Sequence, residues 1–319
     1  MVRPINLDMD ALRSFVAGLD AGSFARAADQ LGRSTSAVSA QLKKLEEQAG
    51  VEILRKSGRG LALTDEGEAL LSYARRLLSL NDEAVSAVRG VELEGWIRLG
   101  LQEDFGETVL PQVLGRFARA HPKVRIEGRI ARNIELKDRL ACGQLDLALA
   151  WDDGARFAVT ERIATLPLRW LAAANAEVPW RAGDDTPLPL IALEAPCILR
   201  TLACEALDRQ DLAWRLAFVS PSVGGIWAAT AAGLGVAVRT PVGRPGAVQL
   251  LDAAAQGLPE LPAMGLLLHR ARQDLGAPGE YLASVIRQAL RETLPAEWVL
   301  PPSVRTAFDR EAGVGLRRL

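Results

Sequence analysis

The most constraining feature of this 319-residue sequence is one long helical segment that separates two stretches of different pattern. Thr64 is a good N-cap, acidic residues fill the turn after it, and no proline or stop signal follows until Gly90. The segment predicts a 25-residue helix over residues 65–89, roughly 37 Å long at 1.5 Å per residue. Such a helix connects domains, and at roughly 150 residues per domain the chain should hold about two.

Small and apolar side chains repeat along this helix at the alternating spacing of four and three that defines a heptad. The repeat predicts that two copies of the chain pair along the helix, with the polar Asn81 setting the register. The alternative is a long helix that packs on its own domain. The predicted dimerisation residues are Leu70, Ala74, Leu77, Asn81, Ala84 and Val88.

Three shorter helices are expected before this segment. The first carries an apolar stripe at i, i+3, i+4 and i+7 over residues 12–19. Ser23 is a candidate N-cap for the second helix, and Gly32 ends it. The third starts near Ser34 or Ser36 and runs to residue 49. Two short helices joined by a tight turn predict a helix-turn-helix.

The third helix has the composition of a recognition helix. Its apolar face is narrow, and the N-terminal half of the opposite face is small, hydroxylated and basic. Recognition helices reach base edges with their N-terminal residues. An ordinary surface helix is the alternative. The candidate residues for contact with base edges or nearby phosphates are Thr35, Ser36, Ser39 and Lys43.

A basic segment follows, although the whole chain has a net charge of −1. Six basic and three acidic residues between positions 33 and 59 give a local excess of +3. Short strands are expected at 51–54 and 61–63, with a basic, glycine-punctuated loop at 55–60 that forms a wing suited to phosphate contact. The candidate phosphate-binding residues are Arg33, Arg55, Lys56 and Arg59.

These residues carry a resemblance to a known family. The segments SFARAA (23–28), SAVSAQLKKLE (36–46), GV (50–51) and LTDEG (63–67) resemble the N-terminal module of LysR-type transcriptional regulators. The resemblance implies a winged helix-turn-helix in which residues of the third helix face base edges and the basic wing holds the DNA backbone. It also implies a dimer that assembles into a homotetramer, and RNA polymerase as a partner.

After Gly95 the pattern changes to strands that alternate with helices, which predicts a mostly parallel sheet covered on both faces. A first set of strands and helices runs over residues 96–150, and a second over residues 188–239. The segment 166–171 is expected to make the first crossing between two lobes and 266–269 to return the chain. A helix over 280–292 would cover the first lobe.

This half resembles the two-lobed, periplasmic-binding-protein-like effector domain of the same family. The motifs are LP (110–111), Phe117, HP (121–122), GQLDLA (143–148) and GLGV (233–236). The expected architecture is a winged helix-turn-helix domain (1–64), a linker helix (65–90), an α/β effector domain (91–298) and a tail (299–319). Within the effector domain, lobe one spans about 91–165 and 263–298 and lobe two about 166–262.

In such sheets ligands bind beyond the carboxyl ends of the strands. Glu103 and Asp104 at the cleft mouth would repel an acidic ligand unless a cation such as Arg200 neutralised them. We therefore expect a neutral, cationic or largely apolar effector. The candidate effector-binding residues are Gln102, Glu103, Asp104, Phe105, Trp151, Glu194, Cys197, Arg200, Ser220, Ser222 and Thr240.

Other chemistries are poorly supported. Three cysteines and two histidines form no cluster with metal-ligand spacing, and no catalytic constellation or cofactor motif is present. Cys142 and Cys204 are expected to be buried thiols, whereas Cys197 at a helix start is a candidate redox sensor. The lack of a signal core or a spanning apolar run predicts a cytoplasmic protein without membrane contact.

The sequence thus predicts a DNA-binding transcriptional regulator, not an enzyme, that binds double-stranded promoter DNA and responds to a small molecule held between two lobes. The alternative is a solute-binding module or an enzyme on the same two-lobed fold, with a helical N-terminus that does not bind DNA.

Overall fold

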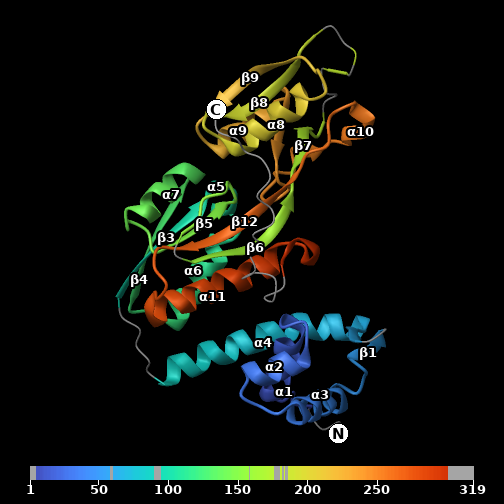
Figure 1. The fold of residues 1–319 in the computed structure, drawn as a ribbon, viewed down its shortest axis with the longest axis vertical. Coiled ribbons are helices and arrows are strands. Elements are labelled where there is room, and N and C mark those ends of the chain that lie inside the picture. The colour runs from blue at the N-terminus through green and yellow to red at the C-terminus, as the bar shows by residue number, and fades with distance from the viewer. Residues whose placement is uncertain are drawn as a thin grey trace. The chain divides into compact units, whose positions relative to one another are not determined.

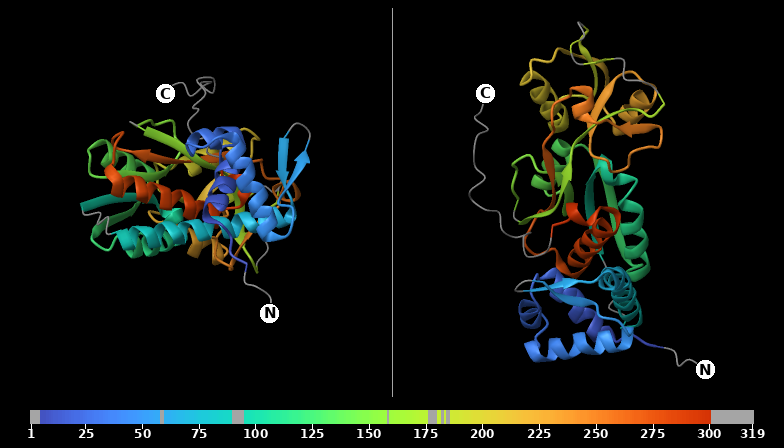
Figure 2. Two further views of the ribbon diagram at one scale, coloured as in Figure 1. Left: turned by 90° about the horizontal axis from the view of Figure 1, so that it is seen from below. Right: turned by 90° about the vertical axis from the view of Figure 1, so that its right-hand side faces the viewer.

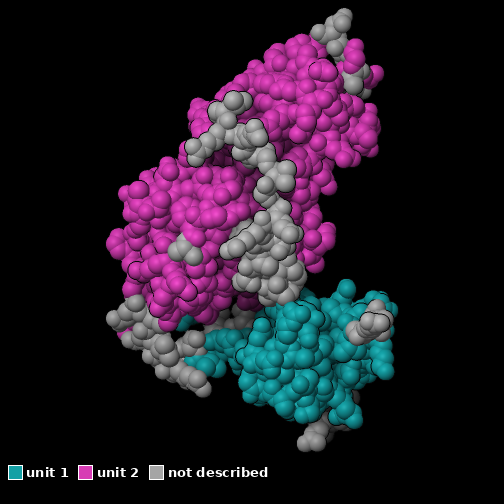
Figure 3. Space-filling model, viewed as in Figure 1, with its two compact units in different colours: residues 1–92, 119–121, 301–319 teal, residues 93–118, 122–300 magenta. Residues whose placement is uncertain are grey.

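The computed structural model describes residues 5–57, 60–89, 95–157, 159–175, 180–181, 183 and 186–300. The chain forms two compact units (Figure 3): unit one comprises residues 1–92, 119–121 and 301–319, and unit two comprises residues 93–118 and 122–300. None of the described helices is long and apolar enough to cross a membrane.

Unit one contains four helices and a β-hairpin among its described residues (Figure 1). The three short helices and the long helix over 65–89 are confirmed, and Thr64 caps the long one by accepting from the Gly67 amide at 3.0 Å. Their apolar stripes meet in one core around Leu12 and Phe15. The elements are α1 (Met9–Asp20), α2 (Phe24–Gln30), α3 (Thr35–Ala49), β1 (Leu54–Ser57), β2 (Gly60–Leu63) and α4 (Asp65–Arg89).

The hairpin β1–β2 projects from these helices (Figure 2), and its first strand begins later than expected. The ladder pairs Leu54 with Leu63 and continues to Ser57 and Gly60, so the strand prediction for 51–54 was wrong except at its last residue. Ile53 is fully buried, and its amide donates to Glu46 Oε1 at 3.1 Å. This contact holds Ile53 directly before β1. The basic residues Arg55 and Lys56 therefore lie in the strand β1 and not in a loop.

The helix α4 turns the N-terminal half of its expected dimer seam toward its own unit. Ala74 is fully buried in the core of unit one, and Leu70 and Leu77 pack against the same core. The prediction that Ala74 faces a second chain is therefore corrected, because the short helices need an apolar partner and α4 supplies it, whereas Leu70 and Leu77 are only partly buried there. A different stripe is left exposed, with Tyr73 and Leu80 each 61% accessible.

The other seam positions differ among themselves. Ala84 is exposed, and the Asn81 amide donates to its neighbour Asp82 at 3.0 Å. Val88 lies in α4, but its side chain is outside the described residues. Two ion pairs tie α4 to α1, namely Arg13 to Asp82 at 2.6 Å and Arg75 to Asp20 at 2.7 Å.

Unit two holds two five-stranded sheets, one in each lobe (Figure 1). Lobe one has the order β4-β3-β5-β12-β6, in which β3 is parallel to β4 and β5 while β12 is antiparallel to β5 and β6. Its strands are β3 (Gly95–Gln102), β4 (Val124–Ala131), β5 (Leu147–Trp151), β6 (Val159–Pro167) and β12 (Ala263–Arg270). Lobe two has the order β11-β7-β10-β8-β9, with β7 (Arg169–Ala173), β8 (Leu188–Leu193), β9 (Trp214–Ser220), β10 (Val236–Arg239) and β11 (Val248–Leu250).

Helices cover both faces of each sheet because successive strand residues point to opposite sides. In lobe two, Leu190 and Ala192 of β8 pack in the main core with α8, whereas Ile191 and Leu193 pack with α9. In lobe one, α6 and α11 lie side by side (Figure 2), while α7 packs on the other face. The helices are α5 (Glu103–Gly106), α6 (Leu110–Ala120), α7 (Asn133–Ala141), α8 (Ile198–Asp208), α9 (Val223–Ala231), α10 (Ala253–Gln256), α11 (Gly276–Thr293) and η1 (Ala296–Trp298).

Two adjacent segments connect the lobes. The strand expected at 166–171 is two strands, β6 and β7, separated by Leu168. The Leu168 amide donates to the Pro262 carbonyl at 3.3 Å, just before β12 returns the chain to lobe one. The tail from residue 301 onward lies outside the described residues.

Candidate functional site

The helix α3 presents a polar face to solvent and an apolar face to the core. Ser34 is its N-cap and accepts from the Ala37 amide at 3.2 Å, and Gly50 ends it in the left-handed conformation at φ 73°. Val38, Leu42 and Leu45 are buried. The residues predicted to reach base edges are all exposed, namely Thr35, Ser36, Ser39 and Lys43.

The polar groups of this face are arranged along the first half of α3. The Ser36 hydroxyl lies 2.9 Å from that of Ser34, and the Ser39 hydroxyl donates to the Thr35 carbonyl at 3.0 Å. The Lys43 ammonium lies 3.9 Å from Glu47, with both side chains more than two-thirds exposed. A pair this exposed is worth little, so Lys43 can exchange Glu47 for a phosphate at small cost.

Two other basic residues near α3 are paired with α1. Arg33 contacts Asp10 at 2.9 Å, and Lys44 contacts Asp8, the N-cap of α1, at 2.7 Å. The Lys44 hydrogen bond holds the pKa of Asp8 below its ordinary value. The structure thus places Arg33, a predicted phosphate contact, in an ion pair that positions α3 against α1.

The wing carries the remaining predicted cations. Arg55 and Lys56 are exposed on β1, and Arg59 lies outside the described residues. Sequence reasoning missed Arg26, which is exposed on α2. The first helix of a helix-turn-helix crosses the DNA backbone, so a basic residue there is a candidate phosphate contact. Its position in the motif at 23–28 is the signal that would have found it.

In unit two, the residues predicted to line the cleft divide into core and interface groups. Phe105 and Trp151 are fully buried and pack against each other with ring centroids 5.3 Å apart. Their prediction as ligand contacts is corrected, because the side chains fill the interior of lobe one. Gln102 is buried and caps α5 by accepting from the Glu103 amide at 3.1 Å.

Asp104 does not face an open cleft. It accepts from Arg239 Nε of lobe two at 3.0 Å and from the Trp151 indole at 3.3 Å. The Arg239 and Asp104 side chains are only 3% and 1% accessible, and the guanidinium lies 6.0 Å from the Trp227 ring. Sequence reasoning named Arg200 as the neutralising cation and missed Arg239, although an arginine ending the apolar strand β10 was a usable signal.

Two further groups of lobe one reach lobe two. Glu103 Oε2 accepts from the Val223 amide, the first of α9, at 2.8 Å. Arg132, just before α7, donates to the carbonyls of Glu194 and Pro196, the second at 2.6 Å. The Glu194 side chain is exposed. Charged groups that follow β3 and β4 of lobe one therefore reach the start of α9, the end of β10 and the segment after β8 in lobe two.

The hydroxyl residues of lobe two surround the same helix end. Ser222 is the N-cap of α9 and accepts from the Gly225 amide at 3.3 Å, while the Ser220 hydroxyl donates to the Ser222 carbonyl at 3.1 Å. A Cβ at Gly225 would lie 2.1 Å from Ser220 Oγ, so only glycine fits there. The Thr240 hydroxyl is buried without a partner among the described residues.

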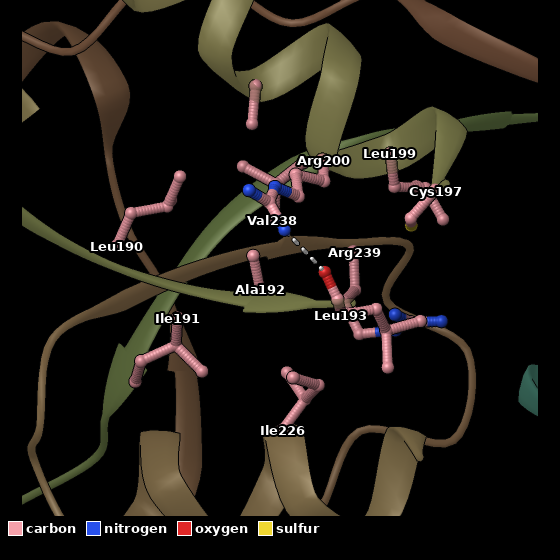
Figure 4. A pocket seen from close by; sticks show the side chains of 11 residues that line it. Leu190, Ile191, Ala192, Leu193, Cys197, Leu199, Arg200, Ile226, Val238 and Arg239 are labelled. Carbon is pink, nitrogen blue, oxygen red and sulfur yellow. Dashed lines mark hydrogen bonds between the residues drawn. The ribbon is translucent and has the colours of Figure 1, made fainter. Parts of the chain in front are cut away.

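Cys197 and Arg200 line a small pocket inside lobe two, not the space between the lobes (Figure 4). Leucine, isoleucine, alanine and valine form most of its wall, and Arg200 donates to the Leu193 carbonyl at 3.4 Å.

The other two cysteines are not part of this pocket wall, and burial raises the pKa of the Cys204 thiol. Cys142 is exposed, which corrects its prediction as a buried thiol, because it lies at the solvent-facing end of α7. Within the described residues, no histidine, cysteine and carboxylate side chains gather as a metal site.

A winged helix-turn-helix on a long helix, followed by a two-lobed α/β unit, is the arrangement of a DNA-binding transcriptional regulator with a second, α/β module. Residues 9–68 match the model of the bacterial regulatory helix-turn-helix protein, lysR family, and residues 90–295 match the LysR substrate binding domain. The chain belongs to the LysR family of transcriptional regulators, which is not a family of enzymes.

Curated relatives and solved structures agree with that assignment. The chain is 33% identical to the regulator PecT of Dickeya dadantii (strain 3937), over 82% of this chain and 81% of PecT. It is 32% identical to the regulator DgdR of Burkholderia cepacia, over 91% of this chain and 95% of DgdR. The fold is similar to that of CrgA, a LysR-type regulator from Neisseria meningitidis, with a TM-score of 0.56, 21% identity, and coverage of 89% and 98% of the two chains.

Proposed function

We propose that this regulator binds double-stranded promoter DNA sequence-specifically through α3 and the β1–β2 wing. The observation that carries the proposal is the polar face of α3: its hydroxyl groups and Lys43 are exposed, while its opposite side is fixed in the core. Arg26, Arg55 and Lys56 add exposed positive charge on neighbouring elements for the phosphate backbone.

We further propose that residues 1–64 form the DNA-binding domain, 65–90 the linker and 91–298 the sensor. A small-molecule effector bound between the two lobes sets the activity. Pairing of two copies through α4 presents two recognition helices to a pseudo-palindromic site, and family resemblance supports a homotetramer and RNA polymerase as a partner. The carboxylate of Glu103 supports an effector that is neutral, cationic or largely apolar, whereas the charge of Asp104 is neutralised by Arg239.

The test is a gel shift of the full chain with promoter DNA over a range of salt concentrations. Lys43→Ala and Arg55→Ala should each weaken binding and lower the slope of log affinity against log salt by about 1 for each copy of the chain on the DNA, hence about 2 for the proposed dimer, because each copy loses one phosphate contact. Arg215→Ala is the matched control, because Arg215 is exposed on β9 of unit two and its loss changes net charge equally.

If both variants retain the affinity and salt slope of the control, DNA binding through this surface is refuted. Negligible binding of the unaltered chain at low salt to any promoter fragment would favour the solute-binding alternative. A loss confined to Lys43→Ala and Arg55→Ala supports the proposal.

A further inference from the structure

The two lobes of unit two are bridged by contacts that the chain makes with itself, at the place where the effector site is proposed. Glu103 reaches the Val223 amide at 2.8 Å, Asp104 pairs with Arg239, and Arg132 bonds two carbonyls of lobe two. All three lobe-one groups come from the ends of β3 and β4, where a bound ligand is expected in this kind of sheet. The charged groups in these contacts between the lobes therefore all come from the protein itself.

The contact of Glu103 has the chemistry of a bound acid. The N-terminus of a helix carries free amides and the positive end of the helix dipole, both of which favour a carboxylate. Glu103 Oε2 takes the first amide of α9, while the Ser222 hydroxyl takes the third, that of Gly225. The anion-binding end of α9 is thus already held by a carboxylate from the opposite lobe.

We propose that Glu103 is the specificity-determining residue of the cleft: it acts as an internal ligand that occupies the first amide of α9, that of Val223, and so excludes acidic effectors. The proposal rests on the effector site proposed above. It assigns the exclusion of acids to occupancy of this amide, not to charge repulsion alone. Asp104 contributes little repulsion, because Arg239 neutralises it at a distance of 3.0 Å.

The α9 end is open to solvent at Gly224, which is exposed and whose added Cβ would meet no atom within 4 Å. Ser220 and Ser222 hydrogen-bond around the start of the helix, and a Cβ at Gly225 would lie 2.1 Å from Ser220 Oγ. The buried Asp104–Arg239 pair remains in place to hold the two lobes near each other.

Isothermal titration of the full chain with succinate tests the proposal. The unaltered chain should bind succinate weakly, and Glu103→Ala should gain about tenfold or more in affinity because the freed Val223 amide makes a charge-assisted hydrogen bond at the positive end of α9. Glu107→Ala is the matched control: Glu107 is exposed one turn further along, and its removal changes net charge equally. The control should bind as weakly as the unaltered chain.

Glu103→Gln separates occupancy from repulsion. Its amide oxygen can still accept from the Val223 amide, so we expect no gain in succinate affinity even though the charge is gone. Equal gains in Glu103→Gln and Glu103→Ala would overturn the proposal in favour of repulsion. Tight succinate binding by the unaltered chain, or no gain in Glu103→Ala, would overturn it outright.

Thermal unfolding provides a second readout on the same variants. Succinate should raise the unfolding temperature of Glu103→Ala and leave that of the unaltered chain and of Glu103→Gln unchanged. An equal rise in all three contradicts the proposal, as does no rise in any of them. Neither measurement contains DNA, so a failed gel shift refutes the proposed DNA-binding surface and leaves these outcomes independent.

Discussion

Asp104 and Arg239 form a buried ion pair that joins the two sheets of unit two. Removing one member of such a pair leaves an uncompensated charge in the interior, which is more costly than removing both. Arg239→Met should therefore lower the free energy of unfolding by about 3–5 kcal/mol. The double variant Asp104→Asn with Arg239→Met should recover a large part of that loss.

Urea unfolding of the full chain, followed by tryptophan fluorescence, measures both changes. Additive losses in the double variant would show that the two side chains are not coupled, contrary to the contact seen here.

His269 in β12 gives unit two a built-in sensitivity to acid. The ring is buried, its Nδ1 lies 3.0 Å from the Thr160 hydroxyl, and its Nε2 has no hydrogen-bond partner among the described residues. Burial lowers the pKa of His269 to about 4, from an ordinary value of 6.5. The folded chain therefore keeps the ring neutral where the unfolded chain takes up a proton.

The neutral His269 ring therefore makes its full contribution to the free energy of unfolding above pH 6.5. This contribution, up to about 3 kcal/mol, is lost as the pH falls from 6.5 toward 4. His269→Gln should show a flatter dependence over that interval in urea unfolding at a series of pH values. Identical slopes for the two proteins would rule out His269 as the source.

For the residues of the cleft, the sequence predicts positions but not side-chain contacts. Parallel strands end on one edge of a sheet, so the positions of Gln102, Glu103 and Ser222 near the cleft could be predicted from strand order alone. Which side chains meet could not. Asp104 and Arg239 are 135 positions apart, and no local pattern specifies that two lobes bring them together.

The helix α4 packs one face in the core of unit one and leaves another apolar face exposed. At 100° per residue, the exposed residues Tyr73, Leu80 and Ala84 fall within about 40° of one another, and Tyr73 lies about 100° from the buried Ala74; of the three, only Ala84 belongs to the expected heptad. We expect this stripe to pair with a second copy. Leu80→Glu should weaken the dimer about tenfold or more, because a charge would be buried without a partner.

Sedimentation velocity over a dilution series measures that dissociation. Ser72→Glu adds the same charge on the exposed side of α4, about 100° from Tyr73, and should leave the dimer intact. A dimer equally stable in both variants would exclude this stripe as the interface.

The heptad on α4 is a useful case for prediction from sequence. The start and stop signals of the sequence predicted both ends of this helix correctly, at residues 65 and 89, because capping and helix propensity are local properties. It could not decide which apolar stripe faces inward, because both Ala74 and Tyr73 lie on stripes with the same repeat. The core of the three short helices makes that choice, and this core exists only after folding. Much of β6 was missed for a similar reason: Thr160, Glu161 and Arg162 dilute its apolar pattern, while pairing with β12 fixes it as a strand.

On the scale of the whole molecule, the two units have separate hydrophobic cores. Leu12 is buried in a cluster built only from unit one, and Leu99 in a cluster that spans both lobes of unit two. We expect two calorimetric transitions. Leu12→Ala should lower one of them and Leu99→Ala the other, each by about 2–5 kcal/mol in unfolding free energy.

Differential scanning calorimetry of the full chain and both variants checks this expectation. A single transition that moves equally with either substitution would show that the two units unfold together.

The return strand β12 has a consequence for the order in which the nascent chain can fold. It lies between β5 and β6 in lobe one, yet it is the last strand of that sheet to leave the ribosome. Residues 169–261, which form lobe two, are complete before it emerges, and their two ends are joined by the bond from Leu168 to Pro262. Lobe two can therefore fold while the sheet of lobe one is still incomplete. That sheet is completed only after β12 has been synthesised.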